Sequence, residues 1–153
     1  MGQIEDTLAQ LGETLPDAPA PAANYVPYLQ VGDMLYVSGQ VSQGPDGLMT
    51  GTLGGPGDIE VGRAAAKACA LSLLAQVRAA TGGDLEKLAQ VVKLTGFVSS
   101  APGFTDQPKV INGASDFLVE VLGDAGRHTR SAVGVSALPM GAMVEIEGIF
   151  RLS

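Results

Sequence analysis

Apolar positions recur with helical spacing in three stretches of the chain. The pattern predicts an N-terminal helix over Gln3–Leu15, a long helix over Ile59–Ala80 and a third over Gln107–Leu122. Asp58 is a suitable N-cap for the long helix, and Gly123 is a stop signal for the third. The long helix carries a face of small residues, so we expect it to pack closely on a sheet.

Shorter apolar runs between these helices predict strands. Tyr28–Val31 and Met34–Gly39 flank Gly32-Asp33, which favours a β-hairpin turn. Val91–Ser99 predicts a single strand. Near the C-terminus, two runs lie on either side of a turn at Pro139–Ala142, and we expect them to form a second hairpin.

The order of these elements predicts an α+β fold, with a mostly antiparallel or mixed β-sheet and two long helices on one face. Residues 1–153 are expected to form one domain, with an N-terminal helix and a Pro-rich linker in residues 1–21. The glycine-rich segment Gln43–Asp58 is expected to be a loop or an irregular edge. Apolar residues remain on the uncovered sheet face, so we expect partner subunits there. Those residues are Tyr36, Val98 and Ile149.

The amino-acid composition excludes several kinds of partner and cofactor. The net charge is −7 with only nine Lys and Arg, so we expect no nucleic-acid partner. One His and one Cys, Cys69, exclude the usual zinc sites, and we expect neither a metal nor another cofactor. Cys69 is expected to be buried and inert. The acidic N-terminus is unlike a secretory signal and no apolar run is long enough to span a membrane, which favours a cytoplasmic protein with no membrane partner.

Arg130 is the most informative candidate for binding chemistry. It begins an otherwise uncharged run, and in an extended chain Arg130, Ala132 and Gly134 share one face. A guanidinium above two such small residues would suit a small anion. The alternative is a surface strand whose terminal charge is solvated. The following run carries Glu145 and Glu147, which are either functional carboxylates or solvated ones.

Several motifs agree with one known family in order and spacing. The chain resembles the RidA/YjgF family of enamine/imine deaminases, long labelled "endoribonuclease L-PSP", from about Tyr25 to Leu152. It looks like a longer branch, with an N-terminal helix and an insertion at Ser100–Gln107. The matching elements are Arg130-Ser131, Leu138-Pro139, Val144-Glu145-Ile146-Glu147, Gly32-Asp33-Met34 and Ser38-Gly39-Gln40.

This resemblance implies a chorismate-mutase-like fold, a homotrimer, and active sites between subunits. It implies hydrolysis of 2-enamino or 2-imino acids to 2-oxo acids and ammonia, in the manner of a 2-iminobutanoate/2-iminopropanoate deaminase, without a cofactor. The implied catalytic residues are Arg130, which binds the substrate carboxylate, Glu145, which positions or activates water, and Ser38, which assists proton transfer. Further implied substrate contacts are Tyr25, Gly39, Asn112 and Ala132, the last in place of a cysteine found in some members.

Structural roles remain open for several of these residues: a packing ring for Tyr25, a backbone-bonded hydroxyl for Ser38 and a surface amide for Asn112. A hairpin about Met140-Gly141 would place Arg130 opposite residue 151, so cooperation with residue 145 would require twist, a bridging water or a neighbouring subunit. A protein that binds small carboxylates without turnover is the alternative function. A ribonuclease is disfavoured by the acidic charge and the single histidine.

Overall fold

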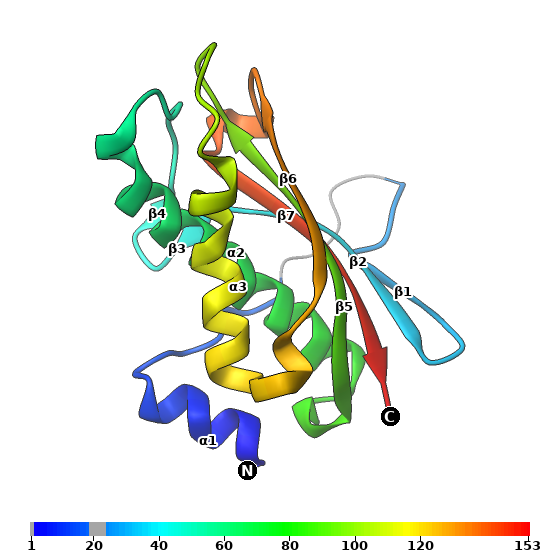
Figure 1. Ribbon diagram of the computed structural model, residues 1–153. Coiled ribbons are helices and arrows are strands. Elements are labelled where there is room, and N and C mark those ends of the chain that lie inside the picture. The colour runs from blue at the N-terminus through cyan, green and yellow to red at the C-terminus, as the bar shows by residue number, and fades with distance from the viewer. Residues whose placement is uncertain (1, 19–23) are drawn as a thin grey trace.

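The computed structural model describes residues 2–18 and 24–153. One mixed sheet of five strands, in the order β1-β2-β7-β5-β6, is covered on one face by the two long helices (Figure 1). The α+β prediction is therefore confirmed. The principal elements are α1 (Gln3–Gln10), β1 (Tyr28–Val31), β2 (Met34–Val41), α2 (Ile59–Ala80), β5 (Leu88–Ser99), α3 (Gln107–Leu122), β6 (Thr129–Val135) and β7 (Val144–Leu152). Minor elements are β3 (Gln43–Gly44), β4 (Gly47–Leu48) and 3₁₀ turns at Pro56–Asp58, Leu85–Lys87, Gly123–Gly126 and Pro139–Gly141.

The two long helices have the predicted bounds, whereas α1 ends earlier than predicted. Gly12 adopts a φ of 75°, a left-handed conformation that ends the helix before residue 15. Asp58 precedes α2, but its carboxylate accepts from the backbone N–H groups of Gly54 (2.8 Å) and Gly55 (3.3 Å) instead of capping the helix. Of the predicted linker, Pro16–Ala18 has no regular structure, and the remainder lies outside the described residues.

The predicted C-terminal hairpin is wrong. Strand β5 lies between β6 and β7, parallel to the first and antiparallel to the second. The end of β5 bonds to both neighbours, because Ser99 N donates to Met143 O (2.9 Å) and Ser100 N donates to Val135 O (2.9 Å). Two strand-forming runs joined by a turn are compatible with direct pairing or with an inserted strand, and the local pattern does not distinguish them. As a result Arg130 lies opposite Leu94, not opposite residue 151.

The hydrophobic core lies between the sheet and the two long helices. Val98 was expected on the uncovered face, but it pairs with Val144 and both are fully buried under the helices. Phe97 occupies the open face instead, opposite Glu145. Cys69 is buried, and burial raises the pKa of its thiol, as expected for an inert cysteine.

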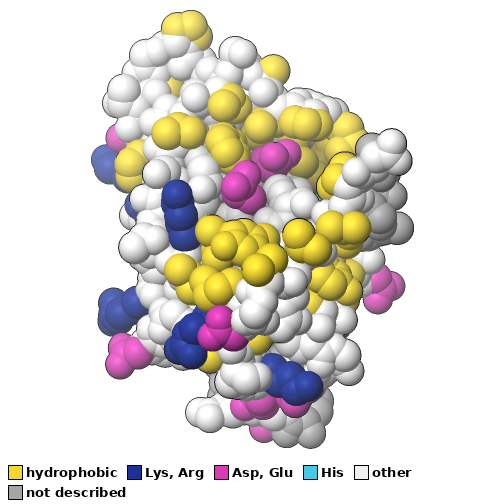
Figure 2. Space-filling model, turned by 90° about the vertical axis from the view of Figure 1, so that its right-hand side faces the viewer, with side chains coloured by type: hydrophobic (Ala, Val, Ile, Leu, Met, Phe, Trp, Pro, Cys, Tyr) yellow, Lys and Arg dark blue, Asp and Glu magenta, His cyan; other side chains and the backbone are white. Residues whose placement is uncertain are grey.

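The open face of the sheet is apolar over most of its width. Figure 2 shows hydrophobic side chains gathered there, with acidic side chains among them. The exposed fractions of four apolar residues on this face are 58% for Leu29, 59% for Val31, 46% for Tyr36 and 44% for Val133. So large an exposed apolar surface is typical of a protein–protein interface.

The crossing of α2 and α3 depends on Gly113. A Cβ atom at this position would collide with the backbone carbonyl of Arg63, so the two helices approach closely only because residue 113 has no side chain. We expect Gly113→Ala to destabilise the fold by about 1–3 kcal/mol, the usual range for overpacking. Urea unfolding measures this, with Glu120→Ala on the exposed side of the same helix as the control. Equal midpoints for the two variants would contradict the close crossing.

Candidate active site

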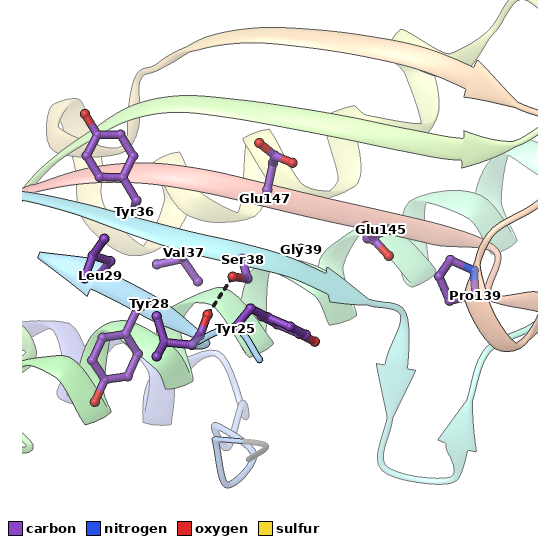
Figure 3. A pocket seen from close by; sticks show the side chains of 11 residues that line it. Tyr25, Tyr28, Leu29, Tyr36, Val37, Ser38, Gly39, Pro139, Glu145 and Glu147 are labelled. Atoms are coloured by element: carbon purple, nitrogen blue, oxygen red, sulfur yellow. Dashed lines mark hydrogen bonds between the residues drawn. The ribbon is translucent and has the colours of Figure 1, made fainter. Parts of the chain in front are cut away.

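A β-bulge in β2 forms the centre of a cleft on the sheet. The pairing of β2 with β7 shifts between Val37 and Gln40, which leaves Ser38 and Gly39 outside the regular ladder. The cleft has a volume of about 720 Å³ and opens on the uncovered face of the sheet (Figure 3). The Ser38 hydroxyl lines it and donates a hydrogen bond to the carbonyl oxygen of Val26 (2.8 Å).

Glu145 contributes the carboxylate of this cleft from β7. Its Oε2 atom would lie only 2.5 Å from a Cβ at position 39, so the absence of a side chain at Gly39 makes room for it. Burial, and secondarily the nearby charge of Glu147, raises the pKa of Glu145 above the ordinary glutamate value. No described residue donates a hydrogen bond to this carboxylate. Glu145 is therefore suited to accept a proton from a bound water.

The bulge is supported from beneath by two glutamines. Nε2 of Gln40 donates to the carbonyl oxygen of Ser38 (2.9 Å), and Nε2 of Gln76 on α2 lies 3.4 Å from Oε1 of Gln40. A second cavity of about 620 Å³ extends from the first toward these side chains and shares Tyr25 and Glu145 with it. Tyr25 is 54% exposed and lines both spaces.

Arg130 lies elsewhere, on edge strand β6. Its side chain points toward α3, where Nη1 donates to Oγ of Ser115 (3.0 Å) and Nη2 donates to the carbonyl oxygen of Pro108 (3.2 Å). The guanidinium is thus half-buried and bonded to the helix rather than being a freely solvated charge. The space above Gly134 is not vacant, because a Cβ there would lie 2.6 Å from Nε2 of Gln107.

Asn112 and Ala132 lie close to Arg130 in the fold. Pro108, Asn112 and Ser115 are spaced by four and three residues, so they form one stripe of α3, the stripe that Arg130 contacts. Ala132 shares the helix-facing side of β6 with Arg130 and packs against the core. The predicted substrate-binding residues Arg130, Asn112 and Ala132 therefore form a second group, which we name the arginine group.

Within one chain the two groups do not meet. Glu145 points to the open face of the sheet, whereas Arg130 points to the face covered by α3, and β5 separates their strands. Sheet twist within a chain does not bring together side chains on opposite faces. The cleft group contains Tyr25, Ser38, Gly39 and Glu145.

Two residues next to Arg130 were missed in the sequence. Ser115 bonds Arg130 directly, and His128 bonds Ser115, with 2.9 Å between Nε2 and Oγ. A local signal was present for both: His128 is two residues before Arg130 on an extended segment, and Ser115 is three residues after Asn112 on a helix.

Two kinds of feature are missing from the described part of the chain. Residues 2–18 and 24–153 contain no group of three or more His, Cys, Asp and Glu side chains that could hold a metal ion. Their helices also include none that is both long and apolar enough to cross a membrane.

Known proteins resemble the chain over nearly its whole length. The family model described as "YjgF/chorismate mutase-like, putative endoribonuclease" matches residues 5–150. Protein TCP17 of Trypanosoma cruzi is 48% identical over 99% of this chain and 96% of that protein. A 2-iminobutanoate/2-iminopropanoate deaminase of Dermatophagoides farinae is 30% identical over 88% of this chain and 90% of that protein.

A solved structure supports the same relationship. The crystal structure of Atu1372 from Agrobacterium tumefaciens superposes with a TM-score of 0.89 at 47% identity, covering 98% of this chain and 92% of that one. The fold is thus the chorismate-mutase-like fold that the sequence motifs implied. With the family model, the relatives and the superposition in agreement, the chain belongs to the YjgF/RidA family.

Proposed function

We propose that the protein hydrolyses 2-enamino and 2-imino acids to 2-oxo acids and ammonia. The observation that carries the proposal is Glu145: a half-buried carboxylate with a raised pKa, in an open cleft, without a hydrogen-bond donor among the described residues. The named deaminase from Dermatophagoides farinae supports the same chemistry.

In the proposed reaction, Arg130 binds the carboxylate of the substrate through two charge-assisted hydrogen bonds. The imine is protonated on its nitrogen before the attack. A water in the cleft then attacks the imine carbon, and Glu145 takes one proton from this water. The protonated Glu145 returns that proton to the amino group of the tetrahedral intermediate. The C–N bond then breaks, the hydroxyl proton is lost, and the products are ammonia and a 2-oxo acid.

The substrate is proposed to lie between two copies of the chain. Because Arg130 and Glu145 face opposite sides of one sheet, a single chain presents half of the chemistry on each side. The exposed apolar residues Leu29, Val31 and Tyr36 would be buried if the open faces of several copies met. A homotrimer satisfies both conditions, and the arginine group of one copy would complete the cleft of the next.

Turnover is tested by generating 2-iminobutanoate with an amino-acid oxidase and following the release of 2-oxobutanoate. A deaminase accelerates this release over the spontaneous rate in proportion to enzyme concentration. A protein that only binds small carboxylates slows release stoichiometrically or leaves it unchanged, and this result would refute the proposed hydrolysis.

The proposed assembly is tested by light scattering. The mass of the particle in solution should be about three times the 15.5 kDa chain mass.

A complementation experiment tests whether the site is shared between copies. Arg130→Ala and Glu145→Gln are each expected to be inactive alone, but mixed trimers pair an intact Arg130 with an intact Glu145 from another copy. Random mixing of equal amounts should restore about a quarter of the wild-type activity, because one site is complete in each hybrid. The two proteins are unfolded together in urea and refolded, with separately refolded samples as controls. No recovery in verified hybrids would refute a site shared between Arg130 of one copy and Glu145 of another.

A further inference from the structure

Arg130 is held by a chain of hydrogen bonds that the proposed chemistry does not use. Its Nη1 atom donates to Oγ of Ser115 (3.0 Å), and its Nη2 atom donates to the carbonyl oxygen of Pro108 (3.2 Å). Oγ of Ser115 lies 2.9 Å from Nε2 of His128. Nδ1 of His128 in turn lies 2.6 Å from the carbonyl oxygen of Gly126.

With the ring of His128 neutral, every bond in this chain has one direction. A carbonyl oxygen can only accept, so Nδ1 of His128 carries the proton that Gly126 O receives. In the neutral ring, Nε2 then has a lone pair and accepts the hydroxyl proton of Ser115. A lone pair of the same hydroxyl oxygen faces Arg130, which can only donate. Burial and the charge of Arg130 lower the pKa of His128, which favours this neutral ring.

We propose that Ser115 and His128 are positioning residues for Arg130: His128 orients the Ser115 hydroxyl, and the hydroxyl orients the guanidinium. This inference rests on the proposed function, in which Arg130 receives the carboxylate of the substrate. With one N–H on Ser115 and another on Pro108, the guanidinium is fixed from the helix side. Its remaining N–H groups are available to a carboxylate.

The arrangement matters because arginine is long and flexible. A planar guanidinium binds a carboxylate well only when both N–H groups of one edge meet both oxygens, so rotation of the plane weakens binding. Arg130 stands at an edge strand, and its hydrogen bonds on the helix side come from α3. Without the Ser115 hydroxyl, the Pro108 carbonyl is the one remaining anchor of these two, and the plane is free to turn.

Two substitutions of His128 separate positioning from a simple structural role. A glutamine side chain places a polar atom near the position of Nε2, so His128→Gln can still accept from Ser115. An asparagine places a donor near the position of Nδ1, so His128→Asn can keep only the bond to Gly126. If His128 only ties the start of β6 to Gly126, asparagine preserves function and glutamine does not. Positioning of Arg130 predicts the reverse order.

Steady-state kinetics of 2-iminobutanoate hydrolysis distinguish these cases. We expect Ser115→Ala and His128→Asn to raise KM by about tenfold, with kcat within about twofold of the wild type, as for the loss of one hydrogen bond that acts through binding. His128→Gln should remain close to the wild type. Thr7→Ala, which removes a helix hydroxyl bonded to Gln3, is the control and should change neither constant. Unchanged KM in Ser115→Ala and His128→Asn would overturn the proposal.

A measurement without substrate keeps the test independent of turnover. The chain has one histidine, so the imidazole nitrogen signals in ¹⁵N NMR belong to His128. A neutral ring with its proton on Nδ1 is expected in the wild type, together with slow rotation of the Arg130 guanidinium that becomes faster in Ser115→Ala. A proton on Nε2, or equal rotation in both proteins, would refute the positioning role. If the spectra show the expected ring proton and guanidinium rotation but the wild type hydrolyses no imine, the proposed function fails while the positioning of Arg130 stands.

Discussion

Arg130→Ala is expected to lower kcat/KM for imine hydrolysis by roughly 30- to several-thousand-fold. This range corresponds to about 2–5 kcal/mol, the usual cost of removing one partner of a charge-assisted hydrogen bond in a partly dry site. Arg130→Lys should recover little of the activity. An ammonium group cannot bond Ser115, Pro108 and both oxygens of a carboxylate at once, because it lacks the planar fork of arginine. The measurement is the release of 2-oxobutanoate under saturating and limiting substrate.

A neighbouring arginine provides the matched control for Arg130. Arg127 lies three residues earlier, is mostly exposed and pairs with Asp124 at 3.3 Å. Arg127→Ala removes the same charge from the same region and should leave kcat/KM within about twofold, as expected for an exposed ion pair. Circular dichroism and light scattering must show an unchanged fold and assembly. If Arg130→Ala is as active as Arg127→Ala, the carboxylate is bound elsewhere.

Glu145→Gln is expected to reduce kcat by about 10²- to 10⁴-fold, the usual contribution of a positioned general base. The amide is nearly the same size, so it still fits against Gly39, but it cannot take a proton from water. KM should change little, because the carboxylate of the substrate is bound by Arg130. The kinetics are measured with the same coupled assay at several pH values.

The pH profile adds a second readout for this carboxylate. Glu145 works as a base when it is deprotonated, so kcat/KM should fall as the pH decreases through its pKa, which burial raises above the ordinary glutamate value. Glu147→Gln removes the charge that contributes to this shift, so it should move the acidic limb to lower pH while preserving the maximum rate. An acidic limb that stays in place in Glu145→Gln, with a normal kcat, would exclude Glu145 as the base.

Much of the fold was predictable because its signals are local. The long helices begin and end where the sequence predicts, since their apolar spacing and the glycine after α3 are read within one segment. The insertion of β5 between β6 and β7 was not predictable, because strand order depends on contacts distant in sequence. The same limitation explains why Val98 was placed on the wrong face.

The candidate site shows the same division between local and distant information. Motif spacing identified Ser38, Gly39 and Glu145, and the structure brings these three residues together at the bulge of β2. It did not identify Ser115 or His128: their spacing from Asn112 and Arg130 was visible in the sequence, but the hydrogen bonds that give them a role form only when β6 packs beside α3. The sequence also did not reveal that Arg130 and Glu145 face opposite sides of the sheet.

The carboxylate against Gly39 has a consequence for the stability of the fold. Folding raises the pKa of Glu145, so the folded chain holds this proton more tightly than the unfolded chain does. The resulting stabilisation is fully present below the pKa of the unfolded state and is lost as the pH rises through the folded value. Above the folded value the native protein therefore carries a partly dehydrated charge that opposes folding. The stability of the surrounding hydrophobic core offsets this cost. A variant chosen only for higher thermal stability would therefore have another residue in place of Glu145.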